Sequence, residues 1–265
     1  MINQDISFKR GVYTCMFGYS ETFADFDYGD PEVDYICFTD DAELRSDVWK
    51  FVLVEDRSTD PARLSKRYKH QPHLFLPQYE SSLYIDNTIK LKVKPSTIFD
   101  RFEAHEMAML RHPYRDCIYD EAAQVIRARY DDPDIIQRQI EAYREVGYPE
   151  RNGLHAAGFL LRRHDSASVQ EACALWNAQV MKYSKRDQLS WNFCAWKLRF
   201  SFTSINEDLH SNSMFDWPVL ANPIRVPRDF DDELYLSLNP DVRQLGLPPR
   251  KHFLHIGAAE KRRYR

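Results

Sequence analysis

Four short runs of apolar and β-forming residues place the strongest constraint on the fold of this chain. They are GVYTCMFG (11–18), DYICFT (34–39), WKFVLV (49–54) and SSLYI (81–85), each closed by glycine or by acidic residues. Short strands of this kind, separated by longer segments, are typical of a mostly parallel sheet in an α/β protein. Ligands of such sheets bind in the crevice beyond the carboxyl ends of the strands. The residues that follow the runs are therefore candidates for a binding site.

The run SSLYIDNTIK (81–90) is the most informative of the four. It ends abruptly in Asp86 and Asn87, and this pattern predicts a buried strand that delivers a carboxylate to the edge of the sheet. The alternative is an ordinary Asp-Asn turn, which is common after a strand.

Composition excludes several classes of protein. With 265 residues, 43% hydrophobic and 29% charged, the chain has an ordinary globular composition. Its net charge of -4 gives no electrostatic footprint for binding a nucleic-acid backbone. The five cysteines are scattered and lack a Cys-x-x-Cys pair, which favours reduced thiols. Because no apolar run resembles a signal peptide or is long enough to cross a bilayer, we expect a cytoplasmic protein without a transmembrane segment.

A basic helix is predicted directly before the run at 81–90. The segment PARLSKRYKHQPH (61–73) carries Arg63, Lys66 and Arg67, which could lie over a diphosphate and supply charge-assisted hydrogen bonds. The alternative is a solvated basic face, the commoner role of a charge run.

The later half predicts further elements and a second group of polar candidates. We expect a helix through 102–110, a brief strand at 117–119, a helix from Pro133 to Gly147, a strand at GFLL (158–161), a helix opened by a capping box at Ser168, and a strand at 200–205. In KRDQLSW (185–191), Asp187 either caps the next helix or points into the cleft beside Gln188 to bind hydroxyl groups.

The composition shifts at residue 222. The segment ANPIRVPRDFDD contains two prolines and resembles a linker, and two short helices are predicted around a Gly-Leu-Pro-Pro turn. We expect a main domain at 1–221, followed by a linker and a small helical appendage at 222–265. The basic end without a closing signal is typical of a piece of a longer protein.

These segments together resemble a glycosyltransferase-like family, formerly a domain of unknown function. The family includes plant mucilage-related and turgor-regulation proteins and bacterial polysaccharide-locus proteins. The matching features occur in family order, and they are YTCMFG, YICFTDD, LSKRYKHQPH, SSLYIDN, CIYDEA, the GL-to-GFLLRRH segment and RDQLSW. The segments YLSLNPDV and HFLHIGAAE resemble a short module that is appended to bacterial polysaccharide glycosyltransferases.

The resemblance implies a glycosyltransferase A-type fold, a Rossmann-like mixed sheet flanked by helices that binds a nucleotide sugar. Such enzymes hold Mg²⁺ or Mn²⁺ with an Asp-x-Asp motif, of which this chain keeps only Asp86. The resemblance assigns Asp86 and Asp187 to catalysis and Asp86 with His210 to a metal. Its donor-binding residues are Arg63, Lys66, Arg67, Asp86 and Asn87, and its acceptor-binding residues are Asp187, Gln188 and His155.

The expected function is transfer of a hexose-like sugar from a nucleotide-sugar donor to a glycan acceptor in polysaccharide biosynthesis. A non-catalytic module that binds a nucleotide sugar or a glycan is the alternative, because the metal motif is reduced. A phosphoryl-transfer hydrolase with an aspartate nucleophile ranks last, because Thr88 stands where a second aspartate is needed.

Overall fold

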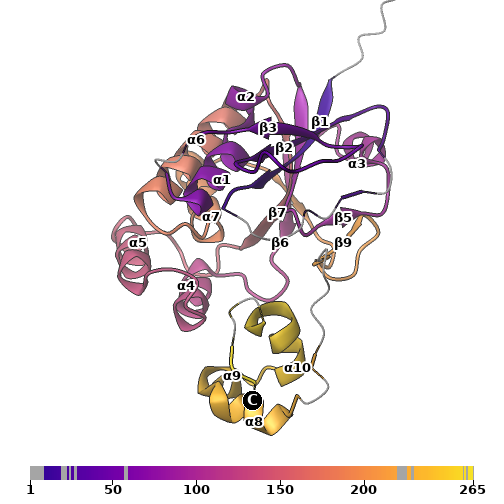
Figure 1. Ribbon diagram of the computed structural model, residues 1–265. Helices are drawn as coiled ribbons and strands as arrows, with labels where there is room; N and C mark the ends of the chain where they lie inside the picture. Colours follow the sequence, from indigo (N-terminus) through magenta and orange to yellow (C-terminus); the bar gives the residue numbers. More distant parts are fainter. Residues whose placement is uncertain are drawn as a thin grey trace, which may run out of the picture.

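A mixed sheet of seven strands forms the centre of the protein (Figure 1). The computed structural model describes residues 9–18, 23, 25–26, 29–56, 59–219, 226–227, 230–258, 260 and 262–264. In sheet order the strands are β3 (Lys50–Leu53), β2 (Asp34–Thr39), β1 (Arg10–Met16), β4 (Ser81–Ile85), β7 (His155–Arg163), β6 (Met107–Arg111) and β8 (Thr203–Ile205). This is an α/β sheet of the kind that the strand pattern predicted, and its Rossmann-like character agrees with what the family resemblance implies.

Strand directions bring several chain segments to one edge of the sheet. Strands β1 to β4 are parallel, whereas β7 runs antiparallel to both β4 and β6. Strand β6 therefore ends at the same edge as β4, and β7 begins there. The chain reverses its direction of travel across the sheet between β1 and β4, which is where open α/β sheets bind ligands.

Helices cover both faces of the sheet. The helices of the main body are α1 (Pro61–His70), α2 (Pro72–Phe75), α3 (Pro95–Arg101), α4 (Ile118–Arg127), α5 (Pro133–Glu145), α6 (Ala167–Lys182) and α7 (Gln188–Leu198). Figure 1 shows α1, α6 and α7 on one side of the sheet and α3, β5 (Lys90–Leu91) and β9 (Phe215–Asp216) on the other.

Alternation along the strands divides the interior into two cores. Tyr84 faces the helices α1, α6 and α7, whereas its neighbours Leu83 and Ile85 face α3 and β9. Because successive side chains of a strand point to opposite faces, a strand that is apolar throughout needs cover on both sides.

Two of the helices begin as the sequence predicts. Asp60 precedes Pro61, and its carboxylate accepts from the N–H of Ala62 at 3.3 Å, so it caps α1. Asp132 caps α5 by accepting from the N–H of Asp134 at 2.8 Å. Such caps satisfy N–H groups that have no partner within the helix.

Several sequence expectations are wrong in detail. Residues 102–110 are not one helix, because α3 ends at Arg101 and 107–111 form β6. Residues 117–119 are not a strand, because α4 begins at Ile118 and Cys117 is the residue directly before it. The cap of α6 is Ser166 rather than Ser168, since the Ser166 hydroxyl accepts from the N–H of Val169.

The C-terminal segment has a small core of its own. Where two helices were predicted, the described residues form α8 (Asp232–Leu238), α9 (Pro240–Gln244), α10 (Pro249–His252) and a π-helical turn, Phe253–Gly257, because Pro240 begins a new helix directly after α8. Phe230, Tyr235, Val242 and Phe253 pack together there, and neither sheet core includes them. The expected boundary at 221–222 lies outside the described residues.

Candidate active site

Asp86 stands at the carboxyl edge of the sheet, directly after β4. Its N–H donates to the carbonyl of Gly158 on β7 at 2.8 Å, and its carboxylate accepts from the Tyr84 hydroxyl at 2.9 Å. A Cβ atom on Gly158 would lie 2.7 Å from Asp86 Oδ2, so glycine is needed for this close approach. The side chain of Asp86 remains 38% exposed and can meet a ligand.

Asp187 lies on the other side of Lys69 from Asp86, against one face of α1. Its Oδ2 atom is 2.7 Å from Lys69 Nζ, 3.1 Å from Lys66 Nζ and 3.5 Å from His70 Nε2. Residues 66, 69 and 70 share a helix face because their spacing is three and four. Lys69 also lies 3.9 Å from Asp86 Oδ1 and 4.8 Å from the centre of the Tyr84 ring, so it connects the two carboxylates. We call Lys66, Lys69, His70, Asp86 and Asp187 the charged cluster.

Asp187 does not cap α7 with its side chain. The structure shows no cap hydrogen bond from this carboxylate. It faces the lysines of α1 instead, a contact that neither alternative described, and its binding of hydroxyl groups stays a prediction. The backbone carbonyl of Asp187 accepts from Trp176 Nε1 at 2.9 Å, and the Trp176 ring stacks on His70 at 3.9 Å. Helices α1, α6 and α7 therefore meet at Asp187.

Burial and the charges of the cluster together determine its protonation. Burial acts to raise the pKa of Asp187, but Lys66 and Lys69 outweigh burial and hold that pKa well below its usual range. Burial acts to lower the pKa of Lys66, but Asp187 and Asp86 raise it. For Lys69, burial lowers the pKa although Asp187 opposes the shift. Burial also lowers the pKa of His70 to about 3, so its imidazole is neutral near pH 7.

Arg162 forms hydrogen bonds with the C-terminal end of α1. This arginine of β7 is fully buried, and its guanidinium donates to the carbonyls of Lys69 and His70 and to the Tyr13 hydroxyl. The last carbonyls of a helix have no partner within the helix, so a buried cation satisfies them and complements the helix dipole. Arg162 thereby fixes the turn that carries Lys69 and His70.

Arg186 is a further cation at the cluster that the sequence reasoning did not single out. It lies over the Tyr130 ring at 5.0 Å, and its Nη2 is 3.5 Å from Gln188 Oε1. Among the described residues, nothing forms a hydrogen bond with its buried Nε. Arg186 is close enough to Lys66 to lower the pKa of that lysine. Its position directly before Asp187 in RDQLSW was the available signal.

The structure brings some predicted site residues together and separates others. Lys66, Asp86 and Asp187 meet in the charged cluster. Arg63 instead donates to the carbonyls of Val180 and Tyr183 at the end of α6, and Arg67 faces Asp56 at 4.0 Å. Neither Arg63 nor Arg67 therefore joins the cluster, whereas Lys69 and His70, which the expected donor site did not include, do.

The remaining candidates have partners within the protein. His155 is buried between the amide of Asn192, at 3.1 Å from its Nδ1, and the Ser204 hydroxyl, at 2.9 Å from its Nε2. Asn87 lies half-buried in the turn after Asp86. His210 Nε2 lies 2.8 Å from the Tyr114 hydroxyl. Within the described part of the chain, no three His, Cys, Asp or Glu side chains form a group able to hold a metal.

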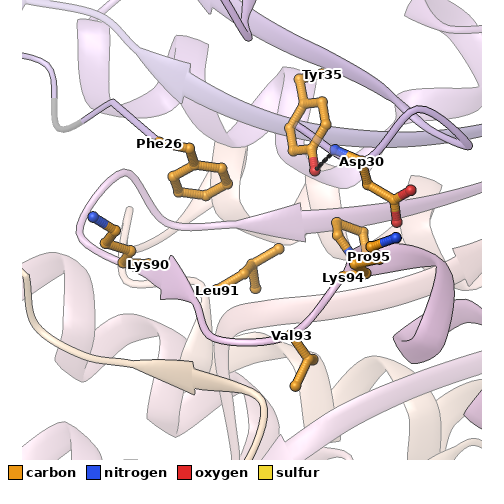
Figure 2. Close-up of a pocket in the computed structure, with 8 residues that line it drawn as sticks. All are labelled: Phe26, Asp30, Tyr35, Lys90, Leu91, Val93, Lys94 and Pro95. Atoms are coloured by element: carbon orange, nitrogen blue, oxygen red, sulfur yellow. Dashed lines mark hydrogen bonds between the residues drawn. The ribbon is translucent and has the colours of Figure 1, made fainter. Parts of the chain in front are cut away.

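A small cavity lies elsewhere, on the side of the sheet that α3 covers. Figure 2 shows it between Phe26 and Tyr35 and the segment from Lys90 to Pro95. Its volume is about 110 Å³. The buried Asp30 at its wall already accepts from the N–H groups of Ser96 and Glu32, at 2.9 and 3.1 Å. No member of the charged cluster lines this cavity, so we place the candidate site at the cluster.

The fold is that of an α/β protein with a Rossmann-like sheet. Its candidate site has two carboxylates, Asp86 and Asp187, with Lys69 between them. A family model described as TOD1/MUCI70, glycosyltransferase-like domain, matches residues 33–217. The match covers more than half of the chain and the whole charged cluster, so the chain belongs to this family, as the motif order predicted. Comparison with curated proteins finds no match. Among the helices that the structure describes, none has the length and apolar composition needed to span a bilayer.

Proposed function

We propose that this protein is a glycosyltransferase that moves a hexose-like sugar from a nucleotide-sugar donor to a glycan acceptor. The supporting observation is the charged cluster, which places Lys66, Lys69 and Asp86 where the carboxyl ends of β1 and β4 meet. The same proposal includes polysaccharide biosynthesis as the process and the cytoplasm as the location.

The chemistry requires positive charge at this edge. Breaking the bond between sugar and phosphate leaves negative charge on the diphosphate, and preorganised cations stabilise that charge most effectively in a partly desolvated site. Arg186 and Lys66 are the cations that we assign to the diphosphate, because both are half-buried at the mouth of the cluster. Lys69 lies deeper and connects the carboxylates.

The proposal includes Mg²⁺ or Mn²⁺ as a cofactor, held by one carboxylate of the protein together with the phosphates of the donor. Mg²⁺ is commonly bound through one or two carboxylates together with substrate phosphates. Asp86 fits the role of that single carboxylate, since its side chain is 38% exposed. The metal would neutralise charge on the leaving diphosphate. His210 makes its contact with Tyr114, so we do not assign it to the metal.

Asp187 has a different role in this proposal. A general base works best when its pKa lies near the operating pH, whereas Lys66 and Lys69 hold the pKa of Asp187 well below its usual range. We therefore assign Asp187 to positioning the two lysines. Gln188, half-buried beside it, remains the candidate for binding an acceptor hydroxyl.

Loss of a charged group from the cluster is expected to remove transfer activity. Asp86→Ala and Lys66→Ala should each lower turnover by about 100-fold or more, as removal of one preorganised electrostatic group does elsewhere. Turnover is measured with purified protein and a panel of nucleotide sugars. Lys182→Ala, an exposed lysine of α6, is the matched control and should keep wild-type turnover. Failure of every donor to bind in calorimetry, with and without Mn²⁺, would refute the proposal.

Gly158→Ala tests the position of Asp86 without changing any charge. The new Cβ atom would lie 2.7 Å from Asp86 Oδ2, so the carboxylate must move. We expect donor affinity to fall about tenfold, which corresponds to about 1.4 kcal/mol. Gly29→Ala is the control, because its Cβ would make only ordinary contacts, at 3.4 Å or more. Calorimetry with the donor distinguishes the two, and equal affinities would show that the position of Asp86 is unimportant.

A binding module without turnover is the second candidate function. Its supporting observation is the turn after β4, where Asp86 is followed by Asn87 and Thr88 instead of a second carboxylate. A binder would bind a nucleotide sugar in calorimetry and release no nucleotide, and Asp86→Ala would then change affinity alone.

A further inference from the structure

Three aromatic rings form a platform at the same edge of the sheet. Tyr114 follows β6 and is 64% exposed, His210 follows β8, and Trp217 follows β9. The ring centres of Tyr114 and His210 are 5.9 Å apart, and those of His210 and Trp217 are 5.0 Å apart. We call Tyr114, His210 and Trp217 the aromatic platform. It unites three chain segments that are far apart in the sequence.

The platform is held in place within the protein. The Tyr114 hydroxyl is 2.8 Å from His210 Nε2, and the N–H of His210 donates to the Asp208 carboxylate at 2.7 Å. Trp217 packs partly against the core that α3 and β9 share. Because these contacts within the protein restrict the rings, binding to them costs little conformational entropy.

The platform adjoins the turn that carries Asp86. The N–H of Val219 donates to the carbonyl of Thr88 at 2.7 Å, and Asp216 of β9 pairs with Lys90 of β5. Trp217 lies between these two contacts along the chain. Asp86 is two residues before Thr88, so the platform borders the candidate site on the side of β6 and β9.

We propose that the aromatic platform binds a neutral sugar ring of the acceptor glycan, an inference that rests on the proposed transferase function. One face of a pyranose ring presents C–H groups, which pack on an aromatic face, while its hydroxyl groups remain in water. The exposed carboxylate of Asp208 beside His210 disfavours an acidic sugar at this place. The neutral class of ligand follows from this combination of flat apolar faces and negative charge.

The test compares Tyr114→Ala with Tyr114→Phe in the full chain. With a donor that the wild type accepts and a panel of neutral oligosaccharides, Tyr114→Ala should raise the acceptor KM about tenfold, as expected for loss of one stacking ring. The ratio of sugar transfer to donor hydrolysis should fall in parallel. Tyr114→Phe keeps the ring and should stay within about threefold of the wild type. Leu74→Ala, at a 58% exposed leucine of α2, is the control for loss of an exposed apolar side chain.

A second measurement needs no donor. In electrophoresis through gels that contain neutral polysaccharides, the wild type should be retarded by at least one of them, and Tyr114→Ala should lose that retardation. Failure of the wild type to bind any nucleotide sugar refutes the transferase function alone, because the gel still reports on the platform. The platform assignment is overturned by a wild type that no neutral glycan retards, by Tyr114→Ala with wild-type KM and mobility, or by equal losses in Tyr114→Phe and Tyr114→Ala.

Discussion

Asp187→Asn is expected to lower the free energy of unfolding by about 3–5 kcal/mol, the usual effect of removing one partner from a buried ion pair. The substitution keeps the shape of the side chain but leaves Lys66 and Lys69 without the carboxylate that lies 3.1 and 2.7 Å from them. Lys69 is 2% exposed, so water cannot replace the lost partner. Urea unfolding followed by circular dichroism measures the change.

The control for this prediction is Asp165→Asn. Asp165 pairs with Arg163 at 2.6 Å, but its side chain is 56% exposed, and we expect a loss of about 1 kcal/mol or less for such a pair. The double variant Asp187→Leu with Lys69→Met should lose less than the sum of its single variants, because both buried charges disappear together. A loss for Asp187→Asn no larger than the control would mean that the ion pairs do not stabilise the contact between α1 and α7.

Stability is expected to fall steeply as the pH drops below 6.5. Burial lowers the pKa of His70 to about 3 and the pKa values of His112 and His164 to about 4. These groups stay neutral in the folded protein while the unfolded chain takes up protons below about pH 6.5, so their contribution is complete above that pH and declines toward pH 4. Each histidine contributes a slope of about 1.4 kcal/mol per pH unit in this window.

His164→Gln isolates one of these contributions. His164 is buried, its Nε2 lies 2.7 Å from the Ser82 hydroxyl, and glutamine can keep a polar contact without titrating. The variant should lose the contribution of one histidine, a slope of about 1.4 kcal/mol per pH unit between pH 4.5 and 6, measured by urea unfolding at several pH values. An unchanged slope would show that His164 takes up its proton in the folded state as easily as in the unfolded chain.

Local sequence patterns predicted the strands that are most apolar. The runs at 34–39 and 81–85 match β2 and β4 because each is short, rich in β-forming residues and closed by acidic residues. Strand β6 was missed because MAMLR consists of good helix formers, and only its pairing with β7 and β8 makes it a strand. The start of α4 was missed although Asp120 and Glu121 give its first turn the acidic character of a helix N-terminus.

The part of the candidate site at the end of β4 could be predicted from the sequence. The part on α1 could be predicted less completely. Asp86 follows from the pattern of β4, and Lys66 from the basic run before it. Lys69 and His70 lie three and four residues after Lys66, so helical spacing alone could have placed them on the same face. The directions of Arg63 and Arg67 depend on α6 and on Asp56, and such distant contacts leave no signal in a local pattern.

Arg162 pairs with Ser82, at the end of β4 that is remote from Asp86, and gives the interior beside the end of α1 a property that surface charges do not have. Its guanidinium is fully buried and is solvated by carbonyl and hydroxyl oxygens, and among the described residues no carboxylate pairs with it. Mobile ions screen charges on a surface within about 10 Å at 0.1 M salt, but they screen a buried charge much less. The positive potential beneath α1 is therefore a permanent feature of the folded chain, and its attraction for an anion should persist at ionic strengths that abolish purely superficial binding.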